Sequence, residues 1–163
     1  MIKKVLPVAV AIWPMLNEID AYQPIDIRGH RSDAIKRRYI VNLKFNDDHH
    51  RDVDAWLRTC LTSFGLEDGK LPWKKDKKTG QLLLMATSRE DYRPISVDAA
   101  KNEVPPSVRV GNGSRLKVYV TVNPYTGFGG GITLIINSYQ ILELKPGGED
   151  PFEKEDGYTV AFG

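Results

Sequence analysis

The sequence has one cysteine, Cys60, among its 163 residues, so the chain cannot form an internal disulfide bond. Disulfide-stapled folds are therefore excluded, and a reducing cytosol is the compartment that fits best. No apolar run reaches the ~18 residues that a membrane span needs. Lys3 and Lys4 before an apolar run superficially resemble a secretory signal, but Ala9–Ala11 lies inside that run, which favours a strand.

The sequence also lacks the motifs of common enzyme sites. It has no Ser/His/Asp order, no nucleophile elbow and no paired cysteines, and no Lys-Ser/Thr follows Gly127–Gly131 as a P-loop requires. Metal-ligand residue types occur together at Asp47, Asp48, His49 and His50. Consecutive helical positions point about 100° apart, so these side chains cannot converge on one ion. Carboxylates at a helix N-terminus explain the acids better. We expect no catalytic residue, metal or cofactor.

Charge is unevenly distributed along the chain. The formal net charge is +2, and residues 147–163 contribute −4 to it from five acids and one lysine, so the first 146 residues carry +6. With 41% hydrophobic residues, we expect one domain over residues 1–146 and an acidic tail segment over 147–163. A basic body with an acidic end is typical of a nucleic-acid binder, although a solvated tail without function explains the charge equally well.

The stretch from Gly111 to Leu144 predicts two β-strands joined by a glycine-rich loop. Its first strand alternates between an apolar and a polar face. The apolar face suits a core, and the polar face combines cations with an aromatic ring, as single-stranded nucleic acid requires. The apolar set is Leu116, Val118, Val120 and Val122, and the polar set is Arg115, Lys117, Tyr119 and Thr121.

Other segments predict further strands and one helix. Lys4–Trp13 forms a strand that Pro14 ends, and a polar loop follows from Asn17 to His30. Arg37–Phe45 alternates again, with Arg38, Ile40, Asn42 and Lys44 facing away from the apolar side. After an N-cap at Asp47 or Asp48, apolar residues recur at spacings of three and four until Gly65, which predicts an amphipathic helix.

Strand starts at Lys4, Arg37, Gln81, Ser114 and Gly131 give five principal strands, with a short one over residues 93–97. Five strands and one long helix without βα alternation predict an all-β fold, the five-stranded OB-fold barrel. Periodicity alone does not separate this barrel from a small jelly roll.

The C-terminal part of the chain resembles a known family. GNGSRLKVYVTVNPY, ITLIINSYQILEL and GGEDPFEKEDGY are similar to motifs of the single-stranded DNA-binding, helix-destabilising replication proteins of podovirus-type phages. Weaker similarity covers Lys3, Lys4, the RRYIVNLKF strand and the helix after it. The resemblance implies an OB-fold, sequence-tolerant binding of single-stranded DNA, no catalysis, and action in DNA replication and recombination in the host cytoplasm. It also implies strand annealing and a homodimer.

The resemblance assigns DNA contacts to Lys3 and Tyr125. Members of the family end in a long, strongly acidic tail with a terminal aromatic residue that docks replication partners, which would be a phage DNA polymerase and helicase-primase. This sequence has only a mildly acidic stretch before Gly163, and its linker after the helix is shorter and basic.

Physical properties add further candidates. Tyr125 follows Pro124 at a strand end, where stacking a base would contribute about 1 to 3 kcal/mol, although a packed corner tyrosine is the alternative. Phe128 could stack, or belong to an ordinary hairpin. Trp73 lies beside several lysines, which usually indicate a solvated loop. The predicted DNA-binding residues are Lys3, Arg38, Trp73, Lys74, Lys75, Arg89, Arg115, Lys117, Tyr119, Tyr125 and Phe128.

Two other functions stay open from the sequence. A phage structural or assembly protein with a jelly-roll fold would use the basic face to bind a protein partner. An RNA-binding OB domain would use the same cations and rings.

Overall fold

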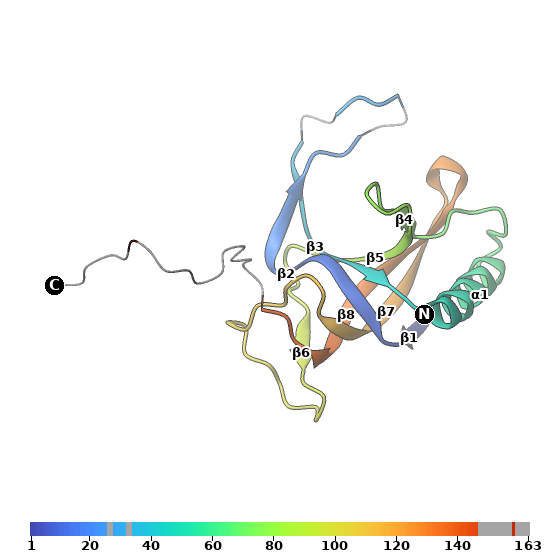
Figure 1. The fold of residues 1–163 in the computed structure, drawn as a ribbon. Coiled ribbons are helices and arrows are strands. Elements are labelled where there is room, and N and C mark those ends of the chain that lie inside the picture. The colour runs from blue at the N-terminus through green and yellow to red at the C-terminus, as the bar shows by residue number, and fades with distance from the viewer. Residues whose placement is uncertain (26–27, 32–33, 147–157, 159–163) are drawn as a thin grey trace.

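The computed structural model describes residues 1–25, 28–31, 34–146 and 158 (Figure 1). The predicted acidic tail, apart from Tyr158, lies outside the described residues. No helix in the described part of the chain is both long enough and apolar enough to cross a membrane. In chain order the elements are β1 (Lys3–Val5), β2 (Ala9–Tyr22), β3 (Lys36–Lys44), α1 (Asp47–Ser63), β4 (Trp73–Lys75), β5 (Leu82–Arg89), β6 (Ile95–Val97), β7 (Arg115–Tyr125), a 3-10 turn (Gly127–Gly129) and β8 (Gly131–Glu143).

Five of the strands close into a barrel. β2 pairs antiparallel with β3 and β7, β3 pairs with β5, and β7 pairs with β8. A parallel contact between Thr87 of β5 and Ile135 of β8 completes the ring. This closed arrangement confirms the predicted OB-fold and excludes the jelly roll, which needs two separate sheets.

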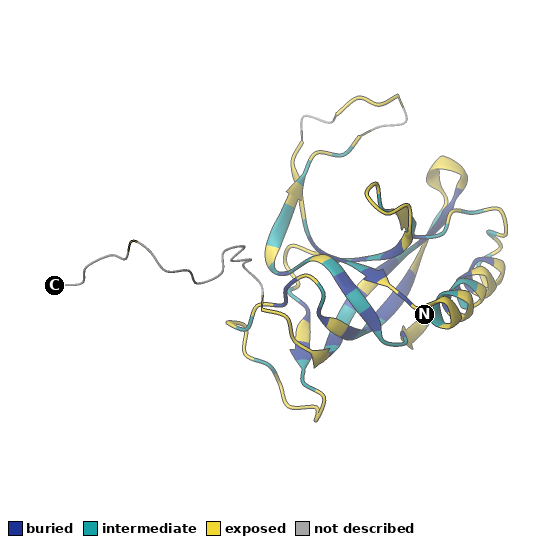
Figure 2. Cartoon of the chain, viewed as in Figure 1, coloured by how far each residue is buried: buried dark blue, intermediate teal, exposed yellow. Residues whose placement is uncertain are grey.

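The alternation of the sequence fills the barrel interior. The four apolar side chains predicted for the inner face of β7 are each no more than 2% exposed, and Ile132, Leu134 and Ile136 of β8 are buried with them. α1 packs its apolar side against the same core, so barrel and helix share one cluster (Figure 2). Burying each such side chain contributes about 1.5–3 kcal/mol. The buried residues of α1 are Val53, Leu57, Cys60 and Leu61.

The first predicted strand is two strands in the structure, and its predicted end at Pro14 was wrong. β1 stops at Val5, and β2 continues through Pro14 to Tyr22, so much of the predicted polar loop is strand. The pairing of β2 with β3 shifts register between Ile12 and Met15. A bulge of this kind leaves a residue without a ladder hydrogen bond, so the missing N–H of proline does not end the strand.

The cap of α1 also differs from the prediction. Asn46, not Asp47 or Asp48, is the N-cap, because its side-chain oxygen accepts a hydrogen bond from the His49 backbone N–H at 2.8 Å. The two aspartates occupy the first helical turn, where negative charge is favourable. The predicted end at Gly65 is confirmed, since this glycine adopts φ +70° just beyond the helix.

The lysine-rich segment after α1 is more ordered than predicted. Trp73–Lys75 forms β4, which pairs antiparallel with β5. The turn that follows is held by Asp76, whose carboxylate accepts hydrogen bonds from the Lys78 backbone N–H at 3.1 Å and the Thr79 hydroxyl at 2.9 Å. The β4–β5 turn, the β2–β3 connection and the tip of the β7–β8 hairpin project toward the same side of the barrel (Figure 1).

Candidate nucleic-acid interface

A groove of about 660 Å³, here called the β2–β3 groove, lies over the outer surface of β2 and β3. β3 contributes Arg38, Ile40 and Asn42, the alternate residues that the sequence predicted to face away from the core. Residues 109–112 bound the groove beyond β2, and Lys74 of β4 bounds it beyond β3. The groove therefore combines one predicted polar face with residues from distant parts of the chain.

Hydrogen bonds from β2 hold residues 108–112 in place along its edge. The Asn17 side chain donates to the Val108 carbonyl at 2.7 Å and accepts from the Val110 backbone N–H at 2.9 Å. The Trp13 backbone N–H donates to Asn112 Oδ1 at 2.9 Å. These long-range contacts give this side of the groove a fixed shape.

Two cations of the groove are paired with carboxylates. Arg38 Nε lies 3.2 Å from Asp20 Oδ2, and its guanidinium carbon is 3.8 Å from the centroid of the Tyr22 ring. Arg109 forms an ion pair with Glu18. The groove thus offers guanidinium groups to a polyanion, but each has a local carboxylate that a phosphate group must compete with.

A second hollow adjoins the groove and extends the cationic surface. Its volume is about 600 Å³, and it shares Tyr22 and Arg38 with the groove. Lys36, Arg37 and Arg89 also line it. Of the predicted DNA-binding residues, the structure therefore gathers Arg38 and Lys74 in the groove and Arg89 beside it.

The Trp73 side chain connects β4 to α1 through contacts with Asp54 and His50. Its indole N–H donates to Asp54 Oδ1 at 2.9 Å, its ring stacks on His50 with centroids 4.2 Å apart, and it forms a T-shaped contact with the Phe45 ring. Partial burial raises the pKa of Asp54, but the hydrogen bonds donated by Arg58 and Trp73 outweigh it and hold the pKa below its ordinary value. The structure gives Trp73 a packing role; base stacking by Trp73 stays an untested prediction.

Lys75 is exposed on β4, next to Lys74, and is not among the residues that line the groove.

Near α1, His50 and Asp54 both contact Trp73. Among the described residues, no three His, Cys, Asp or Glu side chains gather in a way that could hold a metal ion.

A separate surface, here called the β7 face, comprises Lys3, Arg115, Lys117 and Tyr119. Arg115, Lys117 and Tyr119 lie on the outer side of β7, as predicted. β1 pairs with β7 so that Lys3 lies opposite Thr121 on the same side. None of the four lines the β2–β3 groove. The structure therefore separates these four predicted residues from Arg38 and Lys74, and DNA binding by the β7 face stays a prediction.

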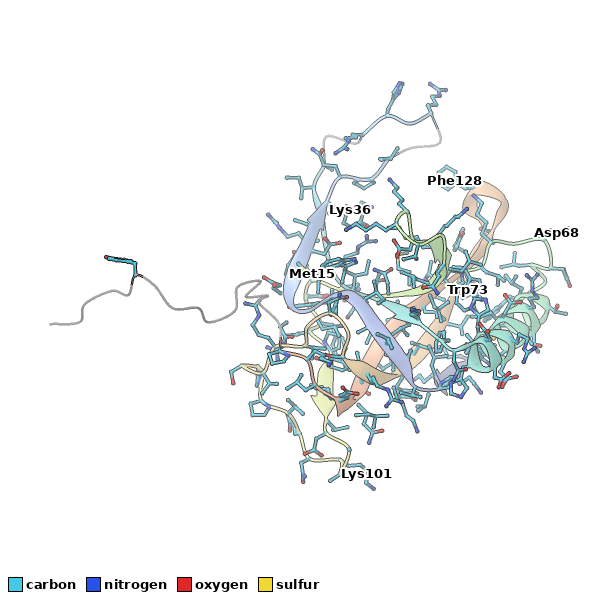
Figure 3. All side chains as sticks on the ribbon, in the orientation of Figure 1. Met15, Lys36, Asp68, Trp73, Lys101 and Phe128 are labelled. Atoms are coloured by element: carbon cyan, nitrogen blue, oxygen red, sulfur yellow. The ribbon has the colours of Figure 1, made fainter. Side chains whose placement is uncertain are left out.

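The two aromatic residues at the β7–β8 hairpin differ in their surroundings. Tyr125 is opposite Gly131, and its ring lies so close that a Cβ on Gly131 would be 2.6 Å from the tyrosine oxygen. This contact favours the packed-corner alternative for Tyr125. Phe128 is 77% exposed, at the tip of the hairpin (Figure 3). Its ring is available to a ligand.

Of the aromatic and cationic residues that line the groove, sequence analysis missed three: Trp13, Tyr22 and Arg109. Ala9 and Ala11 are buried, so simple alternation places Trp13 in the core as well. The Trp13 backbone instead adopts φ +47°, and its side chain is 55% exposed. The Trp13-Pro14 pair within an apolar run was the available signal for a bulge.

No family model matches the sequence, and no curated protein matches it. Solved structures share its fold. The structure of gp2.5, a single-stranded DNA-binding protein encoded by bacteriophage T7, superposes with a TM-score of 0.64 at 18% identity, covering 98% of this chain and 99% of that one. The chain has the fold of phage single-stranded DNA-binding proteins.

The single-stranded DNA-binding protein from bacteriophage Enc34 gives a TM-score of 0.60 at 14% identity, covering 93% of this chain and 87% of that one. Its complex with single-stranded DNA gives 0.63 at 14% identity, covering 90% and 89%. The fold expected from the family resemblance is confirmed over nearly the whole chain. At these identities the likeness concerns the fold, and the chemistry of binding rests on this chain's own residues.

Proposed function

We propose that this protein binds single-stranded DNA in the β2–β3 groove with little preference for sequence. The observation that carries the proposal is the gathering of Arg38, Lys74 and Arg109 along one groove of an OB-fold barrel. OB-folds bind oligonucleotides on their second and third strands and the loops beside them. In this barrel the second strand is β3, which contributes Arg38, Ile40 and Asn42 to the lining of the groove.

The chemistry of the groove supports tolerance of sequence. Arginine and lysine bind phosphate groups, which carry no sequence information. Aromatic rings stack on bases of every kind, because each base has a flat face. A protein that holds strands in this way coats them without selecting a site.

The proposed mechanism depends on a preference for single-stranded over duplex DNA. A protein with affinity for unpaired strands and little for duplex DNA lowers the free energy of the melted state, so hairpins open ahead of a polymerase. We infer a non-enzymatic role in phage DNA replication and recombination in the host cytoplasm, including annealing of complementary strands. Phage DNA polymerase and helicase-primase are the expected partners of the acidic residues 147–163, and a homodimer is the expected assembly.

Fluorescence anisotropy tests the proposal directly. Labelled oligothymidylate, a duplex of equal length and an RNA strand of equal sequence are titrated with the protein over a series of salt concentrations. We expect the single DNA strand to bind more tightly than the duplex, with a slope of log affinity against log salt of about −0.7 for each phosphate neutralised. Equal affinity for single-stranded and duplex DNA, or an affinity that does not depend on salt concentration, contradicts the proposal. Tighter binding of RNA than of DNA would indicate that RNA is the ligand.

A further inference from the structure

The large aromatic side chain of Trp13 is exposed to solvent at the side of the groove. The side chain is 55% exposed, although an apolar ring of this size normally packs inside a protein. Its backbone adopts φ +47°, a left-handed conformation that non-glycine residues rarely take and that costs free energy. The hydrogen bond from its N–H to Asn112 Oδ1 at 2.9 Å holds this conformation. Neither feature contributes to the core, so both point to a ligand.

Lys78, in the β4–β5 turn, contacts this ring. Its Nζ lies 5.7 Å from the centroid of the Trp13 ring, within the range of a cation–π contact. The β4–β5 turn that carries Lys78 is fixed by the hydrogen bonds to Asp76. Lys74, from the same hairpin, lines the groove. The turn therefore brings an ammonium group to the exposed ring of Trp13.

We propose that Trp13 is a base-stacking subsite, which an unpaired nucleobase occupies in place of the Lys78 ammonium group. On binding, the base covers the ring of Trp13, and Lys78 moves to the phosphate of the same nucleotide. This inference rests on the proposed function and deepens it, because it assigns the recognition of a base to one side chain.

The subsite explains how the groove distinguishes single strands from duplex. Phosphates are present in both, so Arg38, Lys74 and Arg109 attract either form. The faces of the bases are covered by their neighbours in a duplex and are free only in an unpaired strand. A ring that must stack on a base therefore contributes only when the strand is single.

The test compares two ligands that differ only in their bases. Oligothymidylate and an abasic strand of equal length are titrated with wild-type protein and with Trp13→Leu, which keeps an apolar side chain without a ring. We expect the substitution to weaken binding of oligothymidylate about 10-fold to 100-fold and to leave the abasic strand unchanged. A parallel loss on both ligands, or no loss on either, overturns the subsite.

Lys77, on the same turn, provides a matched control for Lys78. Lys77→Ala and Lys78→Ala each remove one charge, but only Lys78 contacts Trp13 in the structure. We expect Lys78→Ala to change tryptophan emission of the free protein and to reduce the salt slope more than Lys77→Ala. Quenching of emission by oligothymidylate is expected to fall strongly in Trp13→Phe, since Trp56 and Trp73 are packed against the core.

The outcomes separate the two proposals. If wild-type protein binds neither ligand, the proposed function is wrong. If wild-type protein binds oligothymidylate but Trp13→Leu binds it equally well, single-strand binding stands and the Trp13 subsite is wrong. Thermal unfolding of Trp13→Leu verifies that any loss of binding is not a loss of folded protein.

Discussion

Arg38 lies directly opposite Arg89 in the antiparallel pairing of β3 with β5. Like charges at opposing positions of a sheet destabilise it. Each arginine has an acidic neighbour that reduces the repulsion: Arg38 pairs with Asp20, and Arg89 pairs with Asp91. A phosphate group placed between the two guanidinium groups would stabilise both. This pair lies where the groove joins the second cationic hollow.

Replacing Arg89 with glutamine tests this relationship. We expect weaker binding of oligothymidylate and a salt slope reduced by about 0.7, because one phosphate contact is lost. The free energy of unfolding is expected to stay the same or to rise by about 0.2–1 kcal/mol, since a like-charge pair is removed. Urea denaturation and anisotropy measure the two effects. A less stable protein with unchanged binding would show that Arg89 serves the fold.

Glu18 forms an ion pair with Arg109 in the groove, so a phosphate group bound there would have to compete with its carboxylate. Glu18→Gln is therefore expected to tighten binding of oligothymidylate, since Arg109 no longer has to leave a carboxylate to reach a phosphate, while the salt slope stays the same because the number of phosphate contacts does not change. Asp48→Asn is the matched control, because Asp48 forms an exposed ion pair with Arg51 on α1. Equal effects of the two substitutions would indicate that net charge, and not the groove, governs affinity.

Phe128 is expected to contribute to binding without contributing to stability. Its ring is 77% exposed at the hairpin tip, so Phe128→Leu removes little buried surface. We expect affinity for oligothymidylate to fall by about 1 to 3 kcal/mol while the midpoint of thermal unfolding stays constant. Unchanged affinity would remove the β7–β8 hairpin from the binding surface.

Asp54 makes stability depend on pH in the acid range. Hydrogen bonds from Arg58 and Trp73 hold its pKa below the ordinary value of 3.8, despite the opposing effect of burial. The folded carboxylate therefore contributes stability that is fully present above the unfolded pKa of 3.8 and is lost as the pH falls through the lower folded pKa. Asp54→Asn is expected to lower the free energy of unfolding at neutral pH and to reduce its decline in acid. Urea denaturation across the acid range measures the difference.

The sequence predicted the elements whose signals are local. The alternation of Leu116, Val118 and Val120 identified β7, and the spacing of Val53, Leu57 and Cys60 identified α1, because strand and helix periods differ. The barrel followed from the number and order of these elements. Each depends on residues within one short segment, which a sequence shows directly.

The groove could not be predicted in the same way. It depends on a bulge that turns Trp13 outward, and on residues 109–112, which dock on β2 from about 90 positions away through Asn17. The packing of Trp73 was hidden for a related reason: its partner Asp54 is 19 residues earlier, so the contact cannot be read from the neighbouring lysines. Contacts between distant segments decide which predicted cations share a surface.

The most direct test compares two variants that each lose three positive charges. The groove variant replaces Arg38, Lys74 and Arg109 with glutamine, and the β7-face variant replaces Lys3, Arg115 and Lys117. Binding of labelled oligothymidylate is measured over a salt series. We expect the groove variant alone to lose most of its affinity, with a slope reduced by about 2, the sum of three single-strand phosphate contacts. A larger loss in the β7-face variant would contradict the assignment of DNA to the β2–β3 groove.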